Sequence, residues 1–197
     1  MKKIFFSILF CTFTLFSFSS NSHIENVTSD TKASTIKWIG SKLTSSHEGN
    51  ISIQKGYLSI DHGTLVSGQF AINMNSITCT DIKSEKKNQY LVDHLKDEDF
   101  FNVKTFPISI LTIVKTIKGK GDTYKIIADL TIKGITHSVA FDADVKIDGL
   151  NYVAKAKIQI DRTKWDIKYG SGSFFEDLGD KMIKDEVEFI ISLVSTK

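Results

Sequence analysis

Apolar and polar residues alternate along most of the chain from Ser34 onward. The clearest alternation covers residues 139–147, where every second residue is apolar and the residues between are charged or small. A period of two with one apolar face is typical of an antiparallel strand that is buried on one side. A second alternation covers residues 152–160, and the Asp148–Asn151 segment between the two runs contains the Gly that a tight turn favours. The two runs therefore predict a β-hairpin.

Shorter alternations of the same kind predict further strands, joined mostly by turns that contain Gly. They cover residues 35–39, 51–54, 56–60, 70–74, 106–114, 124–132 and 186–194. This many strands with one polar face need a shared interior for their apolar faces, and closing the sheet provides one without leaving an exposed edge. We therefore expect an all-β fold, an antiparallel barrel of about eight strands whose lumen is just wide enough for side chains or for one slim ligand.

One segment breaks the strand pattern. Between about Lys86 and Asp99, the larger side chains fall at positions i, i+1, i+4 and i+5. These residues are Tyr90, Leu91, His94 and Leu95. Positions separated by three or four residues fall on one face of an α-helix. The spacing predicts one short helix that flanks the barrel and turns this stripe toward it.

The start of the chain has the pattern of a targeting signal. Met1–Lys3 is basic, residues 4–18 are mainly apolar and contain no charge, and Ser19 and Ser20 follow. This order is typical of a secretory signal peptide that is cleaved after export. We therefore expect residues 1–19 to be a signal peptide and the mature protein to be periplasmic or secreted.

The remainder of the chain divides into two parts. Residues 20–33 are polar and lack periodicity, so we expect a flexible N-terminal segment, and residues 34–197 form the predicted barrel domain. Only Cys79 remains after the predicted cleavage, which leaves no partner for an internal disulfide. We expect this cysteine to be buried as a small apolar residue.

Charge and motifs argue against several classes of function. The chain has 25 Lys and Arg and 23 Asp and Glu, and the predicted cleavage removes two lysines and no acid, so the mature chain is near neutral. A nucleic-acid partner would need a clustered basic face, which the sequence lacks. The histidines lack the spacing that places two imidazoles on one metal, and no G-x-S-x-G nucleophile motif occurs. We therefore expect that the protein is not an enzyme and that it has no catalytic residue, no metal site and no cofactor.

The inward faces of the predicted strands contain small residues among large ones. Ala143, Ala154 and Ala156 either leave space for a ligand or match the taper of a barrel filled by its own side chains, and the pattern leaves both alternatives open. The residues expected to line the lumen, and to contact an apolar ligand in a hollow barrel, are Phe70, Ile72, Met74, Ile108, Ile110, Phe141, Ala143, Ala154, Ala156 and Ile158.

Two adjacent aromatic residues, Phe174 and Phe175, lie in a Gly- and Ser-rich segment, residues 170–179. They either form a lid at the mouth of the barrel, where they would touch a ligand or a lipid surface, or fold into the core. The sequence leaves this choice open.

Four parts of the chain resemble the YceI-like family. His94–Phe101 followed by Phe106-Pro107 is similar to the family's HLK-x-x-DFF…(Y/F)P signature. Leu130–Val139 is similar to its G-x-LTI-x-GVT-x-x-V strand pair, Asp161–Ile167 to its R-x-x-(F/W)-x-I element and Asp185–Val187 to its closing strand. The four parts occur in the family's order and span most of the predicted barrel.

The resemblance implies a lipocalin-like barrel, generally periplasmic, with an elongated apolar lumen. It implies binding, storage or transport of a long-chain apolar ligand, such as a polyisoprenoid, an isoprenoid quinone or a fatty-acid-like amphiphile, and it implies no reaction. It also implies that the His94–Phe101 segment plugs or flanks the barrel and that Arg162 anchors a strand end. Ala128, Lys133 and Ser138 depart from the Gly, His and Pro that are commoner in the family.

A second function stays open beside lipid binding. A barrel filled by its own side chains would suit a ligand-free structural or stress-response protein that acts through its surface. The expected partner of the first alternative is an isoprenoid or other long-chain lipid, and a transient contact with a membrane surface and a homodimer are both compatible with the sequence.

Overall fold

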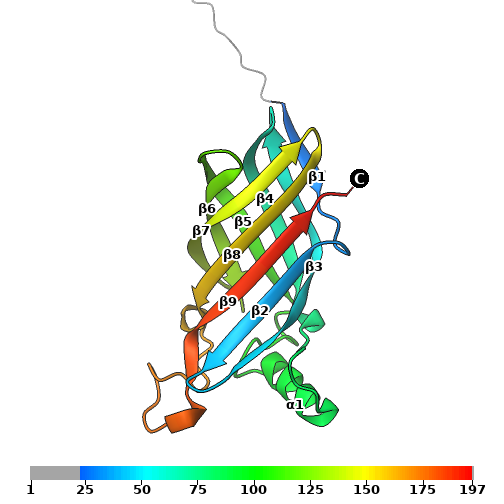
Figure 1. Ribbon diagram of the computed structural model, residues 1–197. Helices are drawn as coiled ribbons and strands as arrows, with labels where there is room; N and C mark the ends of the chain where they lie inside the picture. Colours follow the sequence, from blue (N-terminus) through cyan, green and yellow to red (C-terminus); the bar gives the residue numbers. More distant parts are fainter. Residues whose placement is uncertain (1–22, 197) are drawn as a thin grey trace, which may run out of the picture.

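Within residues 23–196, which a computed structural model of the chain describes, the alternating segments form nine antiparallel strands (Figure 1). The strands are β1 (Ile24–Thr28), β2 (Thr35–Lys42), β3 (Ser46–Asp61), β4 (Thr64–Asn73), β5 (Ile108–Lys118), β6 (Thr123–Ile132), β7 (Ile135–Asp148), β8 (Asn151–Asp161) and β9 (Ile183–Val194). The helical segments are α1 (Glu85–Lys96) and the short 3-10 turns η1 (Met74–Ser76), η2 (Arg162–Trp165) and η3 (Gly179–Lys181). The predicted signal peptide, residues 1–19, lies outside the described residues.

Pairing between β3 and β4 closes the sheet into a barrel. The strands follow the order β1-β3-β2-β9-β8-β7-β6-β5-β4 around it. β2 pairs with residues 46–51 of β3, and β1 pairs with residues 57–61 of the same strand, so β1 and β2 share one position in the wall. The prediction of an eight-stranded antiparallel barrel with one helix is therefore confirmed.

The first strand corrects one expectation. Residues 20–33 were expected to be flexible, but β1 lies within this segment and pairs along its whole length with β3. Val27 is the buried residue of β1, so the apolar alternation is too weak to signal a strand, and backbone pairing holds it instead. A buried hydrogen bond between the hydroxyl groups of Ser29 and Tyr152 fixes the chain directly after β1.

β3 is one long strand where the sequence pattern indicated two. A β-bulge between Ile53 and Lys55 inserts one extra residue relative to β4. Inward residues are odd-numbered up to Ile53 and even-numbered from Gly56, which interrupts the alternation. Gly56 faces a ring of β4 so closely that a Cβ atom there would lie 2.2 Å from Phe70 Cδ1. The close approach of these two strands therefore requires glycine.

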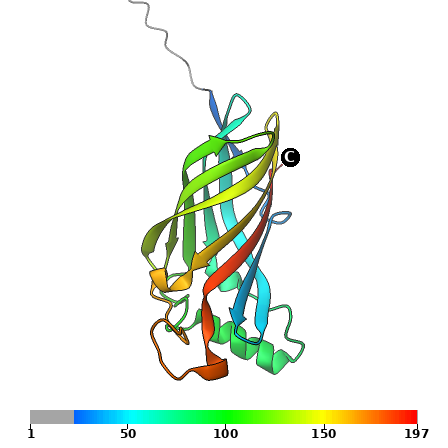
Figure 2. The same ribbon diagram turned by 60° about the vertical axis from the view of Figure 1, so that its left-hand side comes forward.

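The two ends of the barrel are closed differently. At the end that contains the β3–β4, β5–β6 and β7–β8 turns, here called the turn end, Leu65, Tyr124 and Tyr152 are buried. At the opposite end, here called the helix end, α1 lies across the barrel (Figure 2). The buried Trp165 of η2 is fixed at this end because its indole N–H donates to the Leu130 carbonyl at 3.1 Å.

α1 begins and ends close to the predicted helix, but its apolar face is rotated. Val92 is buried, and Leu91 and Leu95 pack against the core. Tyr90, which was expected on the same stripe, is 75 % exposed. Within residues 23–196, no helix is long and apolar enough to cross a membrane.

Candidate functional site

An elongated cavity of about 240 Å³ lies inside the barrel. Side chains from β2 through β9 and from α1 line it, between Leu65 at the turn end and Leu95 at the helix end. Protein interiors normally contain few voids larger than a water molecule. The structure therefore favours the hollow alternative over a barrel filled by its own side chains.

Eight of the residues predicted to line the lumen border this cavity. They are Phe70, Ile72, Met74, Phe141, Ala143, Ala154, Ala156 and Ile158. Ala143 and Ala156 are direct partners in the β7–β8 pairing, so two small side chains meet at one place in the wall. The contact of these residues with a ligand stays a prediction.

Ile108 and Ile110 do not line the cavity, which corrects the prediction for β5. The β5 residues that line it are Ser109, Leu111 and Ile113. Ile110 is 39 % exposed. The start of β5 is apolar on both faces, so alternation alone does not determine which face points inward. The pairing of Leu111 with the inward Phe70 of β4 determines it.

Several lining residues were not among those predicted to line the lumen. They include Ile36, Trp38, Leu91, Leu95, Phe100, Phe101, Phe189 and Ile191. The alternation in β9 did signal an inward face. Phe100 and Phe101, in contrast, follow α1 in an irregular segment that no periodicity describes.

Polar side chains along the cavity gather at the helix end. They are Ser41, Lys42, His47, Ser109 and Arg162. Lys155 also borders the cavity but lies at an exposed, outward position of β8. The lining residues nearest the turn end are Leu58, Leu65, Val145 and Leu193. The cavity is therefore apolar along its length and polar at one end.

His47 is oriented by an aspartate in the segment between η1 and α1. Its Nδ1 atom lies 2.8 Å from Asp81 Oδ2. The other oxygen, Asp81 Oδ1, accepts hydrogen bonds from the Glu48 backbone N–H at 3.0 Å and from the Cys79 thiol at 3.2 Å. Desolvation raises the pKa of Asp81, but these hydrogen bonds and His47 outweigh it and lower the pKa to about 2. Asp81 is therefore ionised, and His47 Nδ1 carries the proton between them.

Cys79 is buried and free, as the sequence predicted. Desolvation is the main cause that raises the pKa of its thiol, which favours the neutral donor over the nucleophilic thiolate. Within the part of the chain that the structure describes, no group of three or more His, Cys, Asp or Glu side chains is arranged to hold a metal ion.

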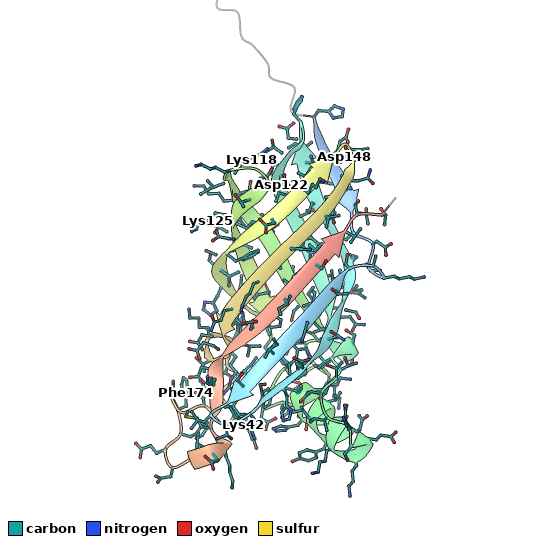
Figure 3. The ribbon with its side chains drawn as sticks, in the orientation of Figure 1. Lys42, Lys118, Asp122, Lys125, Asp148 and Phe174 are labelled. Carbon is teal, nitrogen blue, oxygen red and sulfur yellow. The ribbon has the colours of Figure 1, made fainter. Side chains whose placement is uncertain are left out.

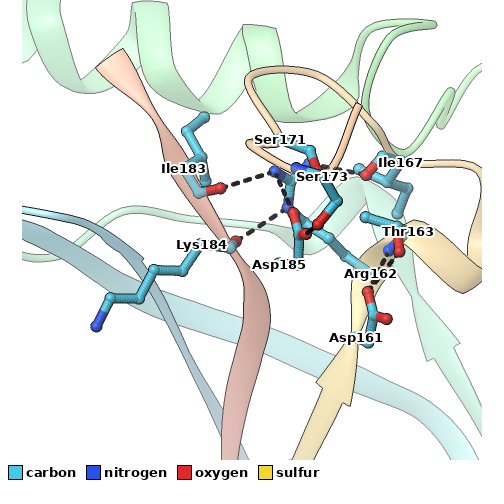
Figure 4. A network of polar contacts seen from close by, with 9 residues as sticks. All are labelled: Asp161, Arg162, Thr163, Ile167, Ser171, Ser173, Ile183, Lys184 and Asp185. Atoms are coloured by element: carbon cyan, nitrogen blue, oxygen red, sulfur yellow. Dashed lines mark hydrogen bonds and ion pairs between the residues drawn. The ribbon is translucent and has the colours of Figure 1, made fainter. Parts of the chain in front are cut away.

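Arg162 is buried at the helix end, where it connects η2 to the start of β9 (Figure 4). Its Nε and Nη2 atoms donate to the carbonyl oxygens of Lys184 and Ile183, at 3.1 and 3.2 Å. Nη1 donates to the Ile167 carbonyl at 2.7 Å, and Nη2 lies 3.4 Å from Asp185 Oδ1. Desolvation lowers the pKa of the guanidinium, and nearby carboxylates oppose this. The prediction that Arg162 anchors a strand end is confirmed.

Phe174 and Phe175 lie outside the cavity lining, in the loop between η2 and η3. They are 50 % and 51 % exposed, so the alternative in which they fold into the core is wrong. The Lys168 ammonium lies 5.0 Å from the centroid of the Phe174 ring, within the range of a cation–π contact. Figure 3 shows Phe174 and Lys42 at the same end of the barrel, so the exposed rings lie on the side of its polar lining.

Comparison with known proteins assigns this barrel to a family. The YceI-like domain matches residues 27–195, which include β2 through β9. The chain belongs to the YceI-like family. A UPF0312 protein of Photorhabdus laumondii is 28 % identical to it over 100 residues, which are 51 % of this chain and 50 % of that protein. The matched region therefore spans half the length of this curated relative.

Two solved structures are similar to this YceI-like barrel. Burkholderia cenocepacia BcnA has a TM-score of 0.67 at 22 % identity, over 85 % of this chain and 99 % of that one. A polyisoprenoid binding domain from Saccharophagus degradans has a TM-score of 0.63 at 15 % identity, over 87 % of this chain and 98 % of that one. At these identities the likeness shows a shared fold.

Proposed function

We propose that this YceI-like barrel binds one long apolar chain in its lumen and stores or transports it. The observation that carries the proposal is the apolar cavity inside the barrel. Its border follows residues 47–58 of β3, a length of ~35 Å along the strand, which suits a slender chain better than a compact ring system. The similar fold of the polyisoprenoid binding domain from S. degradans supports an isoprenoid lipid, an isoprenoid quinone or a fatty-acid-like amphiphile as the ligand class.

The energetics are compatible with a carrier that both loads and releases its ligand. Burying about 400 Å² of apolar chain is worth on the order of 10 kcal/mol relative to water. The loss of freedom on association opposes this by ~4–15 kcal/mol. A bilayer is as apolar as the lumen, so the free energy of transferring the chain between membrane and barrel is close to zero.

The proposed location is the periplasm or the cell exterior. The signal-peptide pattern of residues 1–19 supports it. When the full chain is expressed in its own host, we expect to recover the protein outside the cytoplasm with a new N-terminus near Ser19 or Ser20. Cell fractionation and N-terminal sequencing test this, and an intact Met1 in the cytoplasmic fraction would contradict it.

Exposed aromatic rings support a transient contact with a membrane surface. Phe174 and Phe175 present half of their surface to solvent at the helix end. Phe side chains on the apolar face of membrane-surface segments are buried at the boundary between the headgroups and the acyl chains. We expect the double variant Phe174→Ser/Phe175→Ser to transfer bound lipid to vesicles more slowly than the wild type, while lipid binding in the lumen is not reduced.

Native mass spectrometry of protein purified from its own host tests ligand binding. We expect an adduct with the mass of one long-chain lipid, and solvent extraction followed by mass spectrometry then identifies it. A barrel that carries no lipid after gentle purification and takes up none from membranes would overturn the proposal in favour of a ligand-free interaction protein. No reaction is proposed for this chain.

A further inference from the structure

Two polar residues at the helix end, Lys42 and His47, border the cavity, and each has one group without a partner among residues 23–196. Lys42 forms no ion pair with any of the described residues, 23–196, although its side chain borders the cavity. His47 bonds Asp81 through Nδ1, and its Nε2 atom forms no hydrogen bond within the same residues. Gly40 pairs directly with His47 across β2 and β3, so no side chain from that position covers the imidazole.

Two acidic groups nearby, those of Asp81 and Glu48, are already engaged. Both oxygens of Asp81 accept hydrogen bonds, from His47, from the Glu48 backbone and from the thiol of Cys79. Asp81 itself does not border the cavity. The Glu48 carboxylate pairs with Lys37 at 2.8 Å. The groups left available at this end are therefore a positive charge, an imidazole nitrogen and the Ser41 hydroxyl.

We infer that Ser41, Lys42 and His47 form a head-group subsite for an amphiphile with an anionic head, a carboxylate or a phosphate, whose tail lies in the lumen. The inference rests on the proposed function. The polarity of the cavity sets the orientation, because an ionised head placed among apolar side chains at the turn end would lose its hydration without a partner. At the helix end, Lys42 supplies charge-assisted hydrogen bonding, which is stronger than bonding between neutral groups.

Paired ligands with the same tail and different heads test the subsite. Delipidated full-length protein is titrated by calorimetry with oleate and with oleyl alcohol, each presented from cyclodextrin. We expect oleate to bind about tenfold more tightly than the alcohol at neutral pH. A second pair, farnesyl phosphate and farnesol, distinguishes a phosphate head from a carboxylate head, and a preference for the anion in either pair supports the inference.

Variants locate the preference in the subsite. Lys42→Gln and Lys42→Gln/His47→Gln are expected to lose most of the preference for oleate over oleyl alcohol. Lys125→Gln removes one positive charge from an exposed position on β6 and serves as the control, with the preference unchanged. Circular dichroism confirms that each variant is folded.

The outcomes separate this inference from the proposed function. If both heads bind equally in the wild type, or if the preference survives in the double variant, the head-group subsite is overturned while binding in the lumen stands. If neither tail binds, the lumen proposal is overturned and the subsite falls with it.

Discussion

Arg162 shows how one residue at the helix end holds several segments together. Among the described residues it is the buried charged side chain, at 2 % exposed. Three backbone carbonyls, those of Ile167, Ile183 and Lys184, accept its N–H groups. A buried acceptor that loses its donor costs about 1–3 kcal/mol. The guanidinium therefore stabilises the start of β9 more through these carbonyls than through its long contact with Asp185.

Arg162→Met is expected to lower the free energy of unfolding by about 3–5 kcal/mol, because it leaves the three carbonyls without donors. Arg162→Lys is expected to recover only part of this, since one ammonium cannot reproduce the guanidinium geometry. Urea unfolding followed by tryptophan fluorescence measures both. The control Lys157→Met removes an exposed ion pair with Glu188 and is expected to cost less than about 1 kcal/mol. Equal costs for the variant and the control would contradict the role of Arg162.

Asp81 predicts a specific pH dependence. The pKa of this carboxylate in the folded protein is about 2, below its ordinary value, so the unfolded chain binds the proton more readily. The stabilisation is therefore fully present above pH ~4 and is lost as the pH falls toward 2. We expect Asp81→Asn to be less stable than the wild type at neutral pH and to show a smaller loss on acidification. The free energy of unfolding is measured across this pH range, with the exposed Asp142→Asn as the control. The same pH dependence in both variants would contradict the role of Asp81.

At the scale of the elements, the sequence predicted where the strands lie better than which face of each strand points into the barrel. β7 and β8 alternate cleanly because one face is solvated, so their inward residues were identified correctly. β5 begins with an apolar run on both faces, and its inward face depends on pairing with β4, which no local pattern contains. The break within β3 is a β-bulge, and β1 is held by backbone pairing with a single buried residue.

The contact between β3 and β4 gives a test of this packing. Gly56→Ala is expected to lower stability by about 1–3 kcal/mol, because its Cβ atom would lie 2.2 Å from Phe70 Cδ1. The matched control is Gly40→Ala on β2, where the nearest atom, Cζ3 of Trp38, is 4.0 Å from the added Cβ. Phe70→Leu in the Gly56→Ala background should restore part of the loss. Thermal unfolding of the set would contradict this account if Gly40→Ala cost as much as Gly56→Ala.

At the scale of the whole molecule, the sequence predicted the barrel and much of its lumen but not the polar end of the cavity. That end forms where the β2–β3 turn meets the segment that leads into α1. The bond between His47 and Asp81 joins residues separated by 34 positions. Such a contact exists only once the barrel has closed and the connecting segment has packed against β3, so neither residue type nor spacing indicates it.

Occupancy of the lumen is the central claim, and the paired alanines of β7 and β8 allow a direct measurement. Ala143→Leu/Ala156→Leu places two larger side chains at the point where these strands meet in the cavity. Ala140→Leu makes the same change on the exposed face of β7 and serves as the control. Circular dichroism establishes that each variant is folded.

Native mass spectrometry of the three proteins, each purified from the native host, then reports how many lipid chains each barrel holds. The account predicts one long-chain lipid bound to the wild type and to Ala140→Leu, and little or none bound to the folded double variant. A wild-type barrel without lipid, or a double variant that holds as much lipid as the wild type, would contradict binding in the lumen.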